Sequence, residues 1–259
     1  METAAGIKWR EALAAWAIPQ EILDQAPENP WIHPPALFQI PATIEDSISN
    51  QRAREVLPFG GSVLDIGSGG GIASFALTPP ATTVLGVDHQ VEMLEMFASN
   101  ADSRNLECET FLGFWPEIAP KVPVADVAVA HHVVYNVSRI EDFLLAMNSH
   151  ARKRVVLELP QQHPLSNATG LWKHFWNLDR PTGPTPTELM AVLEELGFKA
   201  QLELWDGSMR GETDVESAAH YSRIRLCLPD SREKEVLEFL EKEPKIAIRN
   251  LATIWWDVE

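Results

Sequence analysis

The stretch of sequence that is most informative about the fold is Ser62–Ala76, SVLDIGSGGGIASFA. The apolar run Val63–Ile66 predicts a buried strand, and Gly67–Gly71 predicts a tight loop. A small, apolar segment beginning at Ile72 then predicts a helix. This order presents backbone N–H groups to a ligand, and the glycines allow φ > 0 and a close approach of the backbone.

The acidic residues around this loop narrow the choice of ligand. A nicotinamide-binding loop, G-x-G-x-x-G, would need a glycine where Ile72 stands. Asp65, in the strand before the loop, would repel a pyrophosphate and suits an amine-bearing ligand. A second apolar run, Thr83–Val87, ends at Asp88, whose carboxylate can accept the hydroxyls of a ribose.

Together, VLDIGSGGG and VLGVD resemble the first two motifs of the class I S-adenosylmethionine-dependent methyltransferases. The resemblance covers roughly residues 55 to 205 and implies S-adenosylmethionine as cofactor, with S-adenosylhomocysteine as product. In that family the glycine loop passes under the methionine part of the cofactor and the second acidic residue holds the ribose. We therefore expect the cofactor to contact Asp65, Gly67, Ser68, Gly69, Gly71, Asp88 and His89.

The adenine contacts depart from the family pattern. An acidic residue often follows the third strand in the family, but here the strand expected at 106–111 runs into Leu112–Pro116. Phe114 or Trp115 could stack on the adenine instead, and the alternative is that both are core aromatics.

Strand-like and helical patterns alternate along the chain, which predicts an α/β fold with a doubly wound, mostly parallel sheet and helices on both faces. The seven expected strands are at 63–66, 83–87, 106–111, 126–130, 154–159, 200–205 and 221–228. The resemblance implies the order 3-2-1-4-5-7-6, in which the last two strands form an antiparallel edge pair. A charged helix at 230–243 and an apolar tail at 254–256 follow.

The division of the chain follows from these patterns. We expect a helical extension or lid at 1–57, with helices at 6–17 and 43–57, and a Rossmann-like methyltransferase domain at 58–259 with an insertion at 161–186. Capping boxes are expected at Ser138 with Glu141 and at Thr185 with Glu188, and Gly197 should end the second of these helices. The lid candidates are Trp31, His33 and Phe38; alternatively, the extension only covers a sheet edge.

The composition indicates which kinds of binding partner and which cellular compartment to expect. The chain has 259 residues, of which 45% are hydrophobic, and its formal charge of −16 argues against a nucleic-acid surface. Two cysteines, Cys108 and Cys227, lie in apolar strand-like runs and predict a reduced, cytoplasmic protein. Neither a membrane span nor a signal peptide is expected, and we expect a monomer or homodimer.

The catalytic candidates follow the fourth strand. His131 and His132 would reach the crevice outside the carboxyl ends of the strands, together with Tyr135, and either histidine could be a general base. The chain has Ala130–Val133 where DNA and protein-amide methyltransferases carry Asn/Asp-Pro-Pro-aromatic, so we expect a small-molecule acceptor, methylated on a hydroxyl or carboxyl oxygen, with nitrogen and carbon left open. The alternative is a cofactor-binding sensor or scaffold without transferase activity.

Two further hypotheses concern side chains near these strand ends. A metal could be held by His131, His132, Glu158 and His163, but no ligand spacing supports it and we expect none. The insertion residues Trp172, Trp176 and Arg180 could line an acceptor pocket with Trp31, the arginine pairing with a carboxylate. Alternatively, these aromatics only cover the sheet.

Overall fold

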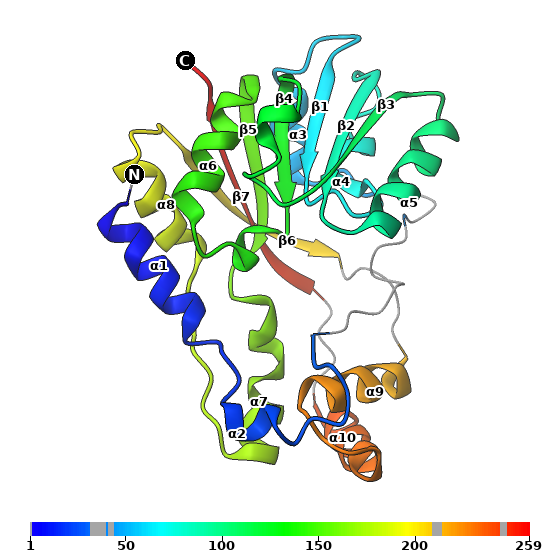
Figure 1. Ribbon diagram of the computed structural model, residues 1–259, viewed down its shortest axis with the longest axis vertical. Coiled ribbons are helices and arrows are strands. Elements are labelled where there is room, and N and C mark those ends of the chain that lie inside the picture. The colour runs from blue at the N-terminus through cyan, green and yellow to red at the C-terminus, as the bar shows by residue number, and fades with distance from the viewer. Residues whose placement is uncertain (1, 32–39, 41–43, 209–213, 244–247) are drawn as a thin grey trace.

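The computed structural model describes residues 2–31, 40, 44–208, 214–243 and 248–259. A seven-stranded sheet in the order β3-β2-β1-β4-β5-β7-β6 lies at its centre, which confirms the predicted fold class and strand order (Figure 1). The strands are β1 Ser62–Ile66, β2 Thr83–Asp88, β3 Glu107–Leu112, β4 Ala125–His131, β5 Ala151–Pro160, β6 Gln201–Ser208 and β7 Ile248–Asp257. Strands β1 to β5 are parallel, and β7 runs antiparallel to both β5 and β6.

The prediction of a strand at 221–228 was wrong. That segment is the end of helix α9, Val215–Arg225, and a turn in which Cys227 takes φ 57°. The seventh strand is β7, which contains the segment interpreted as an apolar tail. Its run Leu251–Trp256 is buried throughout, as a strand covered on both faces requires.

Helices cover both faces of the sheet. One face carries α3 Ile48–Arg54, α4 Ile72–Phe75 and α5 Val91–Asp102, and the other carries α1 Ala4–Ala14, α6 Ile140–Ser149 and α8 Pro186–Glu195. The capping box at Thr185 and Glu188 is confirmed, as is Gly197 after the helix with φ 86°. The one at Ser138 was wrong: α6 begins at Ile140, its N-cap residue is Arg139 and it has no side-chain cap, while Glu141 accepts the Thr3 N–H at 3.0 Å.

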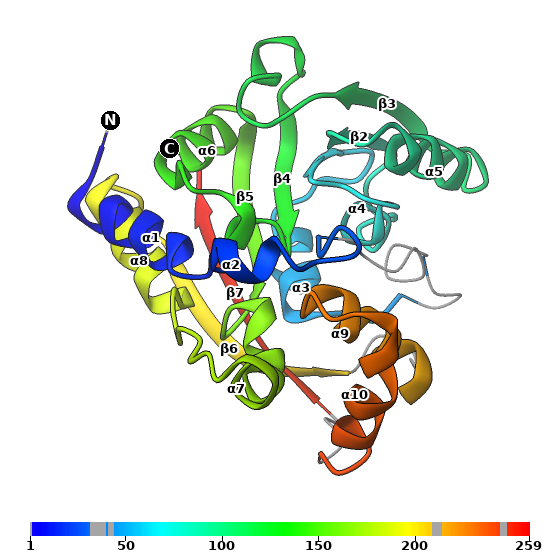
Figure 2. The ribbon, with the colours of Figure 1, turned by 60° about the horizontal axis from the view of Figure 1, so that its bottom comes forward.

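A group of helices lies beyond the carboxyl ends of the strands and forms what we call the cap (Figures 1 and 2). It consists of α2 Gln20–Leu23, α7 Thr169–Trp176, α9 and α10 Glu233–Leu240. The cap has a hydrophobic cluster of its own, distinct from those on the sheet, formed by Ile18, Ile22, Leu171, Trp172, Ala219, Leu226, Cys227, Leu228 and Val236. It therefore joins segments from the N-terminal region, the insertion and the link between β6 and β7.

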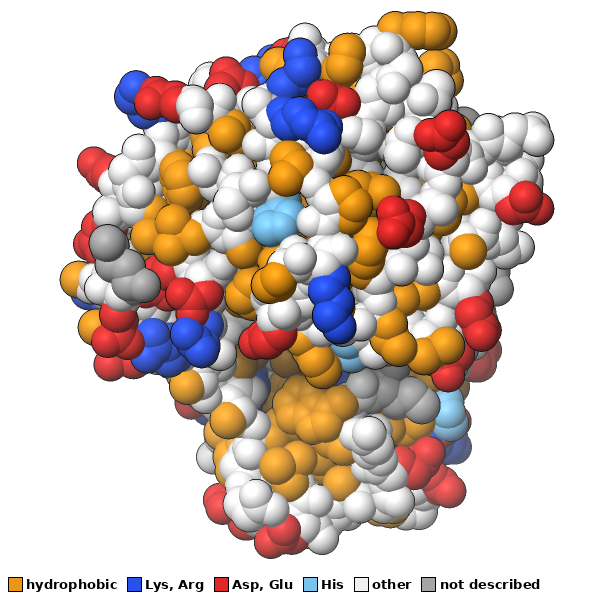
Figure 3. Space-filling view, turned by 45° about the horizontal axis from the view of Figure 1, so that its top comes forward, with side chains coloured by type: hydrophobic (Ala, Val, Ile, Leu, Met, Phe, Trp, Pro, Cys, Tyr) orange, Lys and Arg blue, Asp and Glu red, His pale blue; other side chains and the backbone are white. Residues whose placement is uncertain are grey.

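The surface is hollowed between the part of the molecule that holds the sheet and the part that holds the cap, and hydrophobic side chains gather there (Figure 3).

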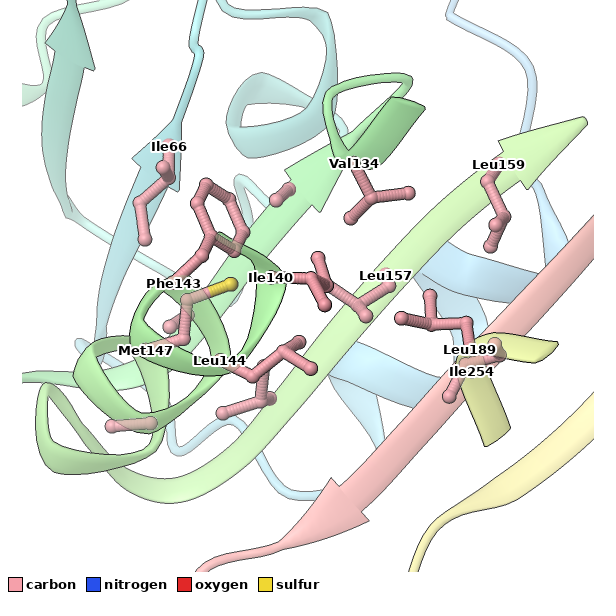
Figure 4. Packing of buried hydrophobic residues seen from close by; sticks show 14 of the residues in the cluster. Ile66, Val134, Ile140, Phe143, Leu144, Met147, Leu157, Leu159, Leu189 and Ile254 are labelled. Atoms are coloured by element: carbon pink, nitrogen blue, oxygen red, sulfur yellow. The ribbon is translucent and has the colours of Figure 1, made fainter. Parts of the chain in front are cut away.

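The largest core cluster fixes the carboxyl ends of the central strands. Phe143, Leu144 and Met147 of α6 pack over β1, β4 and β5, and Leu157 meets Ile254 across the β5–β7 pair (Figure 4). Side chains this deeply buried each contribute roughly 1.5–3 kcal/mol.

Candidate active site

The glycine loop leaves β1 in a conformation that only glycine adopts easily. Gly67, Gly69 and Gly71 have φ values of 67°, 49° and 96°. A Cβ on Gly67 would lie 2.6 Å from Cγ2 of Val133, so the loop after β4 packs directly against the glycine loop. The Ser68 hydroxyl is buried and has no hydrogen-bond partner within the described part of the chain. A ligand on the loop could satisfy it.

Asp65 is a buried carboxylate beneath this loop. Its Oδ2 accepts the N–H of Ser74 at 3.1 Å. Burial raises the pKa of Asp65 to about 7, and the negative charge of Asp88 acts in the same direction. A cationic group beside Asp65 would favour the charged form, which is the chemistry expected for the amine of an amino-acid ligand.

Asp88 ends β2 and faces the same loop. Its Oδ2 accepts the N–H of Gly69 at 3.0 Å, and its Oδ1 accepts the N–H of Gln90 at 3.0 Å. A carboxylate has about four lone-pair sites, so roughly two remain after these bonds. They suit the two hydroxyls of a ribose.

An aromatic pair stands beside Asp88. The rings of His89 and Phe114 stack with centroids 4.9 Å apart, and Phe114 is 67% exposed. Trp115 packs against the main core instead, and its Nε1 donates to the carbonyl of Phe143 at 3.2 Å. Of the two aromatics considered for the adenine, Phe114 is the one on the surface at the expected place.

The histidines at the end of β4 meet a buried carboxylate from β5. His132 Nε2 lies 3.1 Å from Oε1 of Glu158, and His131 Nδ1 lies 3.9 Å from Oε2. Glu158 is 1% exposed. Sequence reasoning considered Glu158 only as a metal ligand. A different role was indicated by the single carboxylate in the apolar run of β5, at the strand position that pairs with His131 at the end of β4.

The metal hypothesis finds no support in the described residues, among which no group of three or more histidines, cysteines or carboxylates could hold an ion. His163 stacks on Trp16, with ring centroids 4.2 Å apart. Burial lowers the pKa of His163 to about 4, and the charge of Arg180 acts in the same direction.

Two of the expected acceptor residues, Trp172 and Arg180, are buried. Arg180 is buried between the rings of Trp16 and Trp172, each 5.1 Å from its guanidinium, and donates to the carbonyls of Trp16 and Ala17. Burial lowers its pKa. Arg180 therefore joins the segment before α2 to the segment after α7.

The remaining acceptor candidates are similarly placed or lie at the edge. Trp176 Nε1 donates to the carbonyl of Leu226 at 2.7 Å, inside the cap. The Tyr135 hydroxyl donates to the carbonyl of Pro160 at 2.7 Å, and burial raises the pKa of Tyr135. Trp31 is 56% exposed, while His33 and Phe38 lie outside the described residues.

In the part of the chain that is described, no helix combines the length and the apolar character needed to cross a membrane.

Comparison with known proteins agrees with this geometry. The profile of a family described as a methyltransferase domain matches residues 39–203, which span β1 to β5 and part of β6. An uncharacterized protein of Haemophilus influenzae is 29% identical over 212 residues, covering 76% of each chain.

Solved structures share the fold at low sequence identity. The YcgJ protein of Bacillus subtilis has a TM-score of 0.54 and 17% identity, over 82% of this chain and 97% of that one. Magnesium protoporphyrin IX methyltransferase of Synechocystis, solved with bound S-adenosylhomocysteine, has a TM-score of 0.50 and 14% identity, over 81% and 80% of the two chains. At these identities the likeness concerns the fold alone.

Proposed function

This chain belongs to the S-adenosylmethionine-dependent methyltransferase family, and from that premise we propose that it methylates a hydroxyl or carboxyl oxygen of a small-molecule acceptor. The cap supports the small-molecule part of the proposal. A helical layer with its own hydrophobic cluster over the carboxyl ends of β4 and β5 suits a small apolar or amphipathic molecule better than a polymer. The formal charge of −16 also disfavours nucleic acid.

The residues around the glycine loop fit the cofactor. In this proposal Asp65 binds its amine, the remaining lone pairs of Asp88 accept its ribose hydroxyls, and the exposed Phe114 stacks on its base. The unsatisfied hydroxyl of Ser68 adds a polar group on the same loop. When bound, S-adenosylmethionine supplies an electrophilic methyl group on a sulfonium, and the sulfur keeps the electron pair of the broken bond.

What the side chains of the protein must do in the reaction depends on the kind of acceptor. A carboxylate is already ionised near neutral pH and needs only orientation and exclusion of water. A hydroxyl must lose its proton as the oxygen–methyl bond forms, and we assign that proton to His131 or His132. His131 ends β4 and His132 precedes Val133, which packs against Gly67, and this placement is the observation that carries the proposal.

The first experiment is titration with S-adenosylhomocysteine and NADH, followed by a screen that detects S-adenosylhomocysteine formed from S-adenosylmethionine. The screen would compare hydroxy-aromatic compounds, carboxylic acids, amines and a structured RNA. We expect stabilisation by S-adenosylhomocysteine alone and turnover with an oxygen acceptor. Turnover with the RNA or only with amines would overturn the proposed acceptor class.

For a hydroxyl acceptor, turnover should fall as the essential base becomes protonated, whereas a carboxylate acceptor should show no such limb near neutral pH. The two outcomes separate the two kinds of oxygen acceptor.

A further inference from the structure

Glu158 is tied to the histidine loop through the backbone as well as through its side chain. His131 and Glu158 are partners in the parallel register of β4 and β5. One residue later, the N–H of His132 donates to the carbonyl oxygen of Glu158 at 2.7 Å. The chain therefore leaves β4 while still bonded to β5, and the three side chains stay at one edge of the sheet.

The backbone of His132 takes a conformation that needs such support. Its φ is 63°, in the left-handed region, which costs a residue with a Cβ about 1–2 kcal/mol. The bond to Glu158 on one side and the packing of Val133 against Gly67 on the other hold it there. Strain of this kind persists only where the surroundings over-determine it, and it is common at active sites.

The side chains make one ring nitrogen of His132 different from the other. Nε2 is buried and lies 3.1 Å from Oε1 of Glu158, as an ion-pair approach without the alignment of a hydrogen bond. Such loose alignment is usual for catalytic groups outside the substrate complex. The side chain as a whole is 25% exposed, so its exposed surface belongs to side-chain atoms other than Nε2.

An ionised carboxylate only accepts hydrogen bonds, so opposite an ionised Glu158 the ring nitrogen that faces it carries the proton when the ring is neutral. The other nitrogen, Nδ1, then keeps its lone pair. The partner of one ring nitrogen generally decides which tautomer a histidine adopts.

We propose that Glu158 is a positioning residue that holds His132 as the Nε2–H tautomer, leaving Nδ1 to accept the proton of a hydroxyl acceptor. The proposal rests on the proposed function, to which it adds the identity of the base and the orientation of its ring. In the step itself, the acceptor oxygen bonds to the methyl carbon, its proton passes to Nδ1, and the sulfur keeps the electron pair of the broken bond.

The test is nitrogen NMR on protein labelled in its eight histidines, with the His132 signals identified by their loss in His132→Gln. In the wild type, at a pH where the ring is neutral, Nε2 should give the shift of a protonated nitrogen and Nδ1 that of an unprotonated one. A wild-type His132 in the Nδ1–H form overturns the proposal without any Glu158 variant.

The Glu158→Gln variant provides the second part of the test. It removes the obligate acceptor, and the fraction of the Nε2–H tautomer should fall; an unchanged fraction in the folded variant overturns the proposal. Glu141→Gln is the matched control, because Glu141 is also a buried carboxylate but bonds to Thr3. It should leave the His132 signals where they are.

Failure of the proposed function would look different. If the wild type did not bind S-adenosylhomocysteine, the proposed cofactor site would be wrong, while the tautomer of His132 would be unaffected. We expect Glu158→Gln to keep its affinity for S-adenosylhomocysteine within about threefold of the wild type, since Glu158 lies on β5 and its carboxylate approaches the two histidines.

Discussion

The ionisation of Asp65 should make the stability of the fold depend on pH in a direction that is unusual for a carboxylate. Its pKa is 3.8 in an ordinary setting and about 7 in the fold, mainly because the side chain is buried. Between about pH 4 and pH 7 the folded chain holds this proton and the unfolded chain does not. The contribution of Asp65 to the free energy of unfolding therefore falls as pH rises through that window.

The size of the effect follows from the two pKa values. The difference between 3.8 and about 7 corresponds to about 4 kcal/mol, since one pKa unit is about 1.36 kcal/mol. Asp65→Asn keeps the shape and can still accept the N–H of Ser74, but has nothing to ionise. We expect the variant to gain up to about 4 kcal/mol over the wild type between about pH 4 and pH 8.

Urea unfolding of both proteins at a series of pH values gives the difference directly and cancels the other titrating groups. Asp102→Asn, at an exposed position in α5, is the control for removing a carboxylate at the surface. A difference curve for Asp65→Asn that does not change with pH would refute the assignment of the raised pKa to Asp65.

Asp88→Ala removes the remaining lone pairs offered to a ribose together with two loop hydrogen bonds, so calorimetry should show S-adenosylhomocysteine affinity at least roughly tenfold weaker in the folded variant. Gly6→Ala would place a Cβ 1.9 Å from Oε1 of Glu141 and should lower the melting temperature despite the better helix propensity of alanine; adding Glu141→Ala should recover part of the loss. His163 has a lowered pKa of about 4, so the unfolded chain binds its proton first and the fold loses stability as pH falls from about 6.5 to about 4; His163→Gln should remove this part of the acid sensitivity in urea unfolding, and unchanged acid sensitivity would contradict it.

Local chemistry explains why the glycine loop and the positions of its acidic neighbours could be predicted from the sequence. The loop at Gly67–Gly71 needs φ > 0 at several positions, and its acidic neighbours Asp65 and Asp88 lie at strand positions that the apolar runs mark. These constraints act within a short stretch of chain, so the sequence expresses them directly. The strand order came from the resemblance, and the structure confirms it.

The seventh strand could not be predicted because the choice is not local. Residues 221–228 and 248–257 both contain short apolar runs, and such runs do not distinguish a strand from a buried helix end. The two segments differ in their tertiary packing: residues 248–257 fill the place between β5 and β6, whereas residues 221–228 pack in the cap.

The acceptor side was harder for a related reason. Arg180 and Trp176 are residue types common in binding sites, but Nη1 and Nη2 of Arg180 and Nε1 of Trp176 donate to backbone carbonyls of the cap and its linkers. A sequence does not show which polar groups are already bonded. Glu158 is the converse case, since its partners come from a neighbouring strand.

The place of β7 also bears on how the chain folds as it is synthesised. In the chain, α9 and α10 come before β7, while in the sheet β7 lies between β5 and β6. During synthesis, β5 and β6 emerge first, and β6 and the outer edge of β5 stay unpaired until the cap helices and then β7 have left the ribosome. Such edges are aggregation-prone. The charges of Glu203 and Asp206 on β6, a strand whose residues are exposed or half-buried apart from Gly207, would discourage wrong pairing during that delay.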